Sequence, residues 1–161
     1  MGREVRMVPA DWQHPKSENG EFIPLFPGDR YQSRVDNWDK EKEEWERGEF
    51  PDYVSDENKK LTFEEWVGAR PNVEDYMSNW PAEQRTHFMM YEDTTKGTPI
   101  SPAFETSEEL AQWLVDNNAS AFGSQTGSYE GWLRIARGGW APSLMIADGI
   151  MVSGVDFKTG E

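Results

Sequence analysis

The sequence contains no cysteine, so neither disulfide bonds nor thiolate chemistry is available to it. Histidine is also scarce: His14 and His87 are the only two, and they lie too far apart in the sequence for a helical metal-binding pair. No stretch approaches the roughly 20 apolar residues that a membrane-spanning helix needs. The N-terminus is charged and has no apolar run, so we expect no signal peptide and a cytoplasmic protein.

Motifs of common catalytic sites are missing as well. There is no Gly-x-Ser-x-Gly, and the loop GSQTGS at residues 123–128 lacks the Gly-Lys-Ser/Thr ending of a phosphate-binding P-loop. A connection with Ser128 as a helix N-cap accounts for this loop. Three pairs of adjacent carboxylates could act as acid and base: Glu64 and Glu65, Glu74 and Asp75, Glu108 and Glu109. Neighbouring residues on a helix face different directions, however, which argues against each pair. We therefore expect no enzymatic activity, no cofactor and no bound metal, and structural hydrogen-bonding roles for His14 and His87.

The composition is acidic and aromatic. Hydrophobic residues make up only 36% of the chain, but aromatic residues make up 13%, which argues against disorder because each aromatic ring buries a large area. The net charge of −14 disfavours direct binding to nucleic acid or an anionic membrane, since both would repel it. A basic protein surface would attract it.

Local patterns predict one α+β domain over residues 1–161, namely a small antiparallel sheet with a C-terminal β-hairpin, packed by three to four short helices. Within it we expect an acidic helical lobe or insertion at residues 31–80 and a C-terminal α+β part at residues 86–161. Strands are predicted at 4–8 and 86–94, and a turn at 95–102. Thr62 and Thr106 each begin a capping box that precedes a helix. Asp148 and Gly149 predict a type I′ turn between two strands at 144–147 and 150–153.

The segment from residue 36 to residue 75 concentrates the charge. Fourteen acidic residues against six basic ones give it a net charge of −8. A helix predicted over residues 31–47 places Tyr31, Val35, Trp38 and Trp45 on one face. Beside that face runs a stripe of four acids, Asp36, Asp39, Glu43 and Glu46. Lys40 and Arg47 are placed to pair with Asp36 and Glu43 at a spacing of four residues.

The stripe has two interpretations. Its acids advance by about 4.5 to 6 Å along the helix, a charge spacing comparable to that of duplex DNA, so the face could occupy a basic groove. It is also typical of an ordinary solvated helix face. If it is an interface, we expect Glu64 and Glu65 to extend it. Most tryptophans sit at apolar helical positions and are expected in the core, whereas Trp12 and Trp80 are the candidates for exposed anchors of a partner.

Several sequence blocks carry a resemblance to known proteins. They are GTPISPAF at 97–104 with EELAQWL at 108–114, GWAPS at 139–143 with VSGV at 152–155, and the opening REVRMVP at 3–9 with Trp12 and Pro15. Together they cover about half of the chain and resemble a group of uncharacterised bacteriophage and prophage proteins. Some members carry paired-cysteine, zinc-knuckle-like insertions in the middle, and this chain has no cysteine, so no metal role follows. The resemblance implies a phage setting.

The leading hypothesis is a non-enzymatic phage accessory protein in the cytoplasm of the bacterial host. It would bind and inhibit a host protein with a basic surface, such as a nucleic-acid-binding component of a defence system, as anti-CRISPR or anti-restriction proteins do. The binding residues would be Asp36, Asp39, Glu43, Glu46, Glu64, Glu65, Trp12 and Trp80. Alternatives are a structural or assembly protein of the phage particle and a small metal-dependent hydrolase. The sequence leaves the oligomeric state open.

Overall fold

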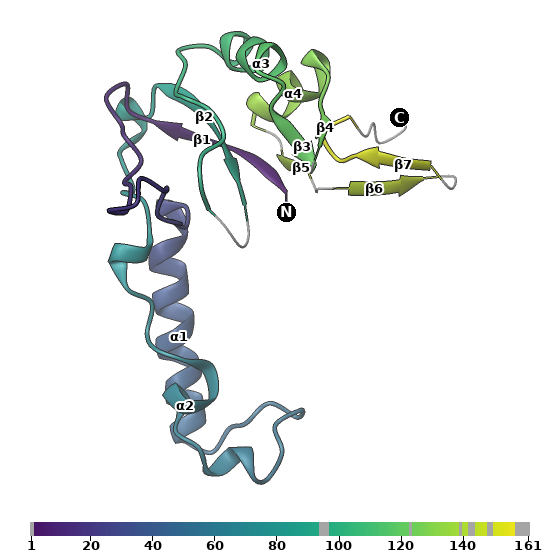
Figure 1. Ribbon diagram of the computed structural model, residues 1–161. Helices are drawn as coiled ribbons and strands as arrows, with labels where there is room; N and C mark the ends of the chain where they lie inside the picture. The colour runs from purple at the N-terminus through teal and green to yellow at the C-terminus, as the bar shows by residue number, and fades with distance from the viewer. Residues whose placement is uncertain are drawn as a thin grey trace. The chain divides into compact units, whose positions relative to one another are not determined.

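The computed structural model describes residues 2–93, 97–122, 124–138, 140–141, 144–147 and 150–156. The chain divides into two compact units, which we call the sheet unit (residues 1–25 and 80–161) and the acidic unit (residues 26–79). In the described residues the fold is α+β, with four α-helices and three small antiparallel sheets (Figure 1). Within these ranges, every helix is too short or too polar to cross a membrane.

The sheet unit is built around the first strand of the chain. β1 (Arg3–Val8) lies between β2 (His87–Glu92) and β5 (Trp140–Ala141), and it pairs antiparallel with both. Its register with β2 sets Val5 opposite Met90 and Val8 opposite His87. Both β1 and β2 were predicted within two residues of their observed ends.

Two helices cover the core of this unit. α3 (Ser107–Asp116) and α4 (Tyr129–Ala136) begin at Thr106 and Ser128, whose hydroxyl oxygens accept the N–H groups of Glu109 and Gly131. Both N-caps were predicted, but the described residues show only this half of the capping box predicted at Thr106, without the return bond from the Thr106 N–H to the Glu109 carboxylate. The fully buried residues that they share with β2 include Met90, Leu110, Leu114, Trp132 and Ile135. These helices therefore fix β2 from one side.

Residues 97–104, which include most of the predicted turn, also form an extended segment that bonds to β2. Thr98 accepts the N–H of Glu92, and backbone bonds of 2.9 Å join Ile100 to Met90 and Phe104 to Phe88. Pro99 and Pro102, which suggested a turn, lack N–H groups, and the segment bonds to β2 through neighbouring residues: Thr98, Ile100 and Phe104. The prolines therefore sit in an extended segment that lies along the edge of β2.

Two small hairpins complete the sheet unit. β3 (Ser120–Phe122) pairs with β4 (Gln125–Thr126), and β6 (Leu144–Ala147) pairs with β7 (Ile150–Ser153) in antiparallel register. The predicted C-terminal hairpin is thus confirmed in its strands. Its predicted type I′ turn at Asp148 and Gly149 lies outside the described residues.

The acidic unit is organised by α1 (Tyr31–Glu46), which buries Val35, Trp38 and Trp45 as the helical periodicity predicted. The helix ends in a Schellman motif. Gly48 adopts a left-handed φ of 80°, its N–H bonds to the carbonyl of Trp45, and the N–H of Glu49 bonds to that of Glu44. The motif turns the chain back, so that the Phe50 ring lies 4.6 Å from the Trp45 ring.

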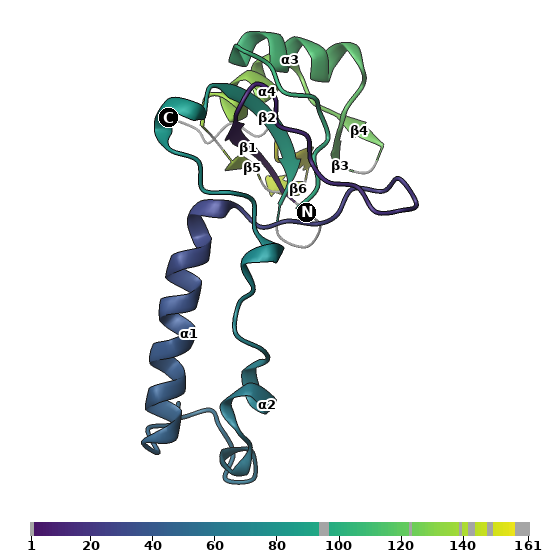
Figure 2. The same cartoon turned by 90° about the vertical axis from the view of Figure 1, so that its left-hand side faces the viewer.

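The returning chain packs α2 (Phe63–Val67) beside α1 (Figure 2). The predicted capping box is complete, because Thr62 accepts the N–H of Glu65 and the Glu65 carboxylate accepts the N–H of Thr62. A small core of Trp38, Trp45, Val54 and Phe63 joins the two helices, with Phe50 and Trp66 against it. Aromatic rings thus stabilise a segment with few aliphatic residues.

Candidate functional site

The predicted interface residues divide between the two units. All six carboxylates belong to the acidic unit, whereas Trp12 and Trp80 belong to the sheet unit. The two tryptophans were expected to be exposed, but both are half-buried and pack edge to face with ring centroids 4.9 Å apart. Trp12 also donates its indole N–H to the Tyr91 hydroxyl at 3.2 Å. Both side chains therefore have structural roles in the sheet unit.

Three of the six predicted carboxylates make hydrogen bonds that join separate parts of the acidic unit or cap its helix α2. Asp39 accepts two hydrogen bonds from the Arg70 guanidinium, at 3.0 Å each, and this pairing holds the pKa of Asp39 below its usual value. Glu64 accepts a hydrogen bond from Lys42, which lowers the pKa of Glu64. Glu65 closes the capping box. These three acids stabilise the unit itself.

The other three predicted carboxylates lie exposed along α1. Asp36 accepts the amide N–H of Gln32, Glu46 lies 3.9 Å from Lys42, and Glu43 is exposed one turn before Arg47. The predicted partners of the basic residues were wrong: Lys40 lies 3.8 Å from Glu44, and Arg47 bonds to Glu49. Arg47 bonds beyond the helix because the Schellman motif brings Glu49 back toward it. Asp36, Glu43 and Glu46 therefore form an acidic ridge that faces solvent.

An aromatic pocket, which the sequence did not predict, opens in the same unit. Its volume is about 390 Å³, and helix α1, the Schellman turn and α2 all contribute to it. Its lining combines three glutamates with five aromatic residues and two other apolar residues: Glu41, Glu44, Glu49, Trp45, Phe50, Tyr53, Phe63, Trp66, Pro51, Val67. No basic residue is among these ten described residues. The pocket can accept an apolar or planar group that carries positive charge.

The aromatic pocket depends on two hydrogen bonds that orient the tryptophans beside it. Trp45 donates its indole N–H to the Leu61 carbonyl at 3.0 Å, and Trp38 donates its own to the Gly68 carbonyl at 3.3 Å. The Trp45 and Trp66 rings are stacked, with centroids 6.0 Å apart and an angle of 20° between their planes. Whereas Trp45 is buried, the Tyr53 side chain of the same lining is 80% exposed.

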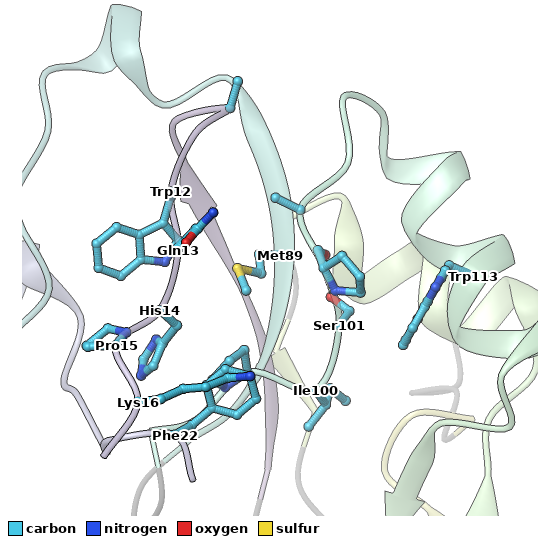
Figure 3. A pocket seen from close by; sticks show the side chains of 14 residues that line it. Trp12, Gln13, His14, Pro15, Lys16, Phe22, Met89, Ile100, Ser101 and Trp113 are labelled. Carbon is cyan, nitrogen blue, oxygen red and sulfur yellow. Dashed lines mark hydrogen bonds between the residues drawn. The ribbon is translucent and has the colours of Figure 1, made fainter. Parts of the chain in front are cut away.

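A second cavity, which we call the groove, lies in the sheet unit and has a volume of about 800 Å³. Figure 3 shows its two sides, with Trp12, His14 and Phe22 of the N-terminal segment facing the segment of Ile100 and Ser101. Met89 lies between them and Trp113 at the far end. Its fourteen described lining residues include Lys16 and no carboxylate.

Both buried polar side chains of the groove are used within the fold. His14 bonds through Nε2 to the Ile23 carbonyl at 2.6 Å and through Nδ1 to the Tyr91 hydroxyl at 2.9 Å. Ser101 accepts the N–H of Met90 and donates to the Pro102 carbonyl. The lining of the groove therefore offers an aromatic surface with one exposed cation, Lys16. The hydrogen-bonding groups of His14 and Ser101 are used by contacts within the fold.

A neutral His14 ring satisfies the network around it. Because a carbonyl only accepts, Nε2 carries the hydrogen and Nδ1 accepts from Tyr91, whose oxygen accepts from Trp12. Burial lowers the pKa of His14 below its ordinary value of 6.5, and burial raises the pKa of Tyr91 to about 12. The structural role predicted for His14 is confirmed. His87 bonds to the hydroxyl of Thr86 at 2.8 Å.

We expect His14 to make the sheet unit less stable in mild acid. A folded-state pKa below the unfolded value means that its contribution is complete above about pH 6.5 and declines as the pH falls from there toward the folded pKa. Urea unfolding at about pH 7.5 and about pH 5.5 should show a larger decrease for the wild type than for His14→Gln, which does not titrate. Equal decreases in the two proteins would show that His14 is not responsible.

Comparisons of the whole chain with protein-family models, with curated proteins and with solved structures find no match. In the described residues, no group of three or more His, Asp or Glu side chains is placed to hold a metal ion. The candidate site is therefore defined by its geometry and charge, and it consists of the acidic ridge and the aromatic pocket of the acidic unit.

Proposed function

We propose that this protein binds a basic protein surface through its acidic unit and thereby blocks that surface. The observation that supports this most is the exposed ridge of Asp36, Glu43 and Glu46 on a rigid helix, in a segment with a net charge of −8. A helix held by a Schellman motif and a packed aromatic core presents these charges in a fixed arrangement. A fixed arrangement loses less conformational entropy on binding than a disordered acidic tail would lose.

Basic protein surfaces that match such a ridge are often those that hold nucleic acid. The ridge advances from Asp36 to Glu46 over ten residues, or about 15 Å of helix, a length comparable to several phosphate spacings of duplex DNA. A partner whose groove accepts phosphates could therefore accept the ridge in their place. Direct binding of this chain to nucleic acid is disfavoured by its net charge of −14.

The biological setting of the proposal comes from the sequence blocks that resemble bacteriophage and prophage proteins. In that setting, we propose a phage-encoded accessory protein that acts in the bacterial cytoplasm. It would inhibit a nucleic-acid-binding component of a host defence system, in the manner of anti-CRISPR or anti-restriction proteins. This role needs no catalytic group, because occupation of the basic surface is sufficient for inhibition.

Affinity capture from a bacterial lysate tests the proposal. The immobilised full chain should retain a basic nucleic-acid-binding protein and release it at moderate salt, about 0.3 M, because the contacts are electrostatic and solvent-exposed. Mass spectrometry would identify the eluted protein. Retention of phage particle proteins would instead favour an assembly role, and recovery of the immobilised chain alone would leave room for a small metal-dependent hydrolase.

A further inference from the structure

We propose that the aromatic pocket of the acidic unit holds one arginine side chain of the partner and anchors it there. This inference rests on the proposed function, because it specifies how the same unit recognises a basic protein. The ridge would supply long-range attraction, and the pocket would supply a defined contact. Arginine is the cation that the lining fits best, for reasons of shape, charge and the contacts already present in this unit.

The shape of the pocket suits one planar side chain. At about 390 Å³ it lies near the lower end of the range of about 300 to 1,000 Å³ for ligand sites. The stacked Trp45 and Trp66 rings and the perpendicular Phe50 ring give it flat aromatic walls. Tyr53 is the most exposed aromatic residue of the lining and can close over an occupant. A guanidinium group stacks on such walls better than a tetrahedral ammonium does.

The charge of the pocket selects a cation. Glu41 and Glu44, one turn apart on α1, and Glu49 from the Schellman turn contribute carboxylates to a lining that has no basic residue. Glu44 is already half-buried. Glu44 lies 3.8 Å from Lys40, and Glu49 bonds to Arg47. Both of these basic residues are exposed to solvent and lie outside the lining. A purely apolar occupant would remove the three carboxylates from water and add no new partner, which is unfavourable. A guanidinium would instead bond to one or two of them while it stacks on the rings.

The acidic unit already pairs cations with aromatic rings. Lys42 lies 5.3 Å from the centre of the Trp38 ring, and Lys59 lies 5.7 Å from that of Phe50. Arg34 lies 5.0 Å from that of Phe26. Three such contacts in 54 residues exceed the usual frequency of about one per 70 to 80 residues. Phe50 lines the pocket, so the Lys59 contact shows that one wall of the pocket already accepts a cation, while the lining itself contains no basic residue. The aromatic surface of this unit is therefore suited to cations.

Peptide titrations followed by NMR test the inference. The probes are three short Gly-Ser peptides that are identical except for one central residue, which is arginine, lysine or citrulline. Citrulline keeps the shape of arginine without its charge. We expect the arginine peptide to shift the indole N–H signals of Trp45 and Trp66 saturably, the lysine peptide to bind about threefold more weakly, and the citrulline peptide to produce no shift.

Substitutions in the full-length chain show whether the pocket causes these shifts. Tyr53→Ala and Glu44→Gln should each weaken binding of the arginine peptide about threefold to fivefold, since each removes one contact that the pocket would make with the guanidinium. Glu74→Gln, an exposed residue of the same unit outside both the ridge and the lining, is the matched control and should leave the affinity unchanged. Equal shifts with citrulline, the absence of shifts with arginine up to about 10 mM, or equal losses in Glu74→Gln would overturn the inference.

The two proposals fail separately in these experiments. If the arginine peptide does not shift the indole N–H signals but lysate capture still yields a basic protein released by salt, the acidic unit binds its partner without an arginine anchor. If the pocket binds the arginine peptide but capture yields no basic protein, the proposed function is wrong and the pocket serves another ligand.

Discussion

Reversing the three ridge charges, with Asp36→Lys, Glu43→Lys and Glu46→Lys together, should weaken binding of the captured partner at least about 100-fold. Each exposed ion pair contributes up to about 1 kcal/mol, and a reversed charge replaces this attraction with repulsion, so three positions lose about 3 kcal/mol or more. Titration calorimetry of the purified pair would measure the change. All three side chains are exposed, so circular dichroism should show the same helix content as the wild type.

The control for this triple variant carries the same change in net charge on the other unit. Glu18→Lys, Glu83→Lys and Glu105→Lys alter exposed residues of the sheet unit. If binding depended only on net charge, both triple variants would lose affinity equally. The ridge model requires the control to bind within about threefold of the wild type, and an equal loss in the control would refute it.

The largest expected effect on stability comes from Trp132→Ala. Trp132 is fully buried among Leu110, Leu114 and Ile135, and Trp-to-Ala substitutions in cores usually cost about 3 to 5 kcal/mol because a cavity remains. Gly127 encloses the indole closely, since a Cβ at that position would lie 2.8 Å from the indole nitrogen. Urea unfolding of the sheet unit, followed by tryptophan fluorescence, would measure the loss.

Trp132→Phe separates the loss of volume from the loss of the indole N–H. In the described part of the chain, this buried N–H has no hydrogen-bond partner, so the native indole already carries an unsatisfied donor. Phenylalanine removes that donor while it keeps most of the ring, and we expect a cost below about 1.5 kcal/mol. A loss in Trp132→Phe as large as that in Trp132→Ala would mean that the N–H has a partner that stabilises the fold.

The sequence predicted the helix ends, because each is formed by residues that are close together in the chain. The caps at Thr62, Thr106 and Ser128 involve contacts over three residues, and all three are present. The stop at Gly48 is equally local, because a left-handed φ favours glycine. The α+β class followed from these elements and from the strand patterns.

Contacts between distant residues could not be predicted in the same way. Arg70 is 31 residues from Asp39, and only the packed return of the chain brings the two together. The pairing gives Asp39 a structural role that its place in the acidic stripe did not predict. The prolines at 99 and 102 indicated a turn, but the N–H groups of Ile100 and Phe104 bond to β2.

The aromatic pocket illustrates both sides of this limit. Trp45 was correctly predicted to be buried. A helical wheel assigns each residue either to the core or to the surface, so it cannot show that a core residue also lines a surface pocket. One signal was available: Glu41 and Glu44 lie four and one positions before Trp45, and Phe50 follows a helix stop. That spacing places carboxylates beside an aromatic cluster, and only the Schellman turn shows that they enclose a cavity.

Displacement of nucleic acid tests the central claim most directly. The partner recovered by salt elution would be loaded with labelled duplex DNA and then titrated with the wild-type chain or with the triple ridge variant. We expect the wild type to release the DNA as it binds and the ridge variant to release little or none. A stable complex that contains the wild-type chain, the partner and the DNA together would contradict the claim, because the acidic unit would then not occupy the surface that holds nucleic acid.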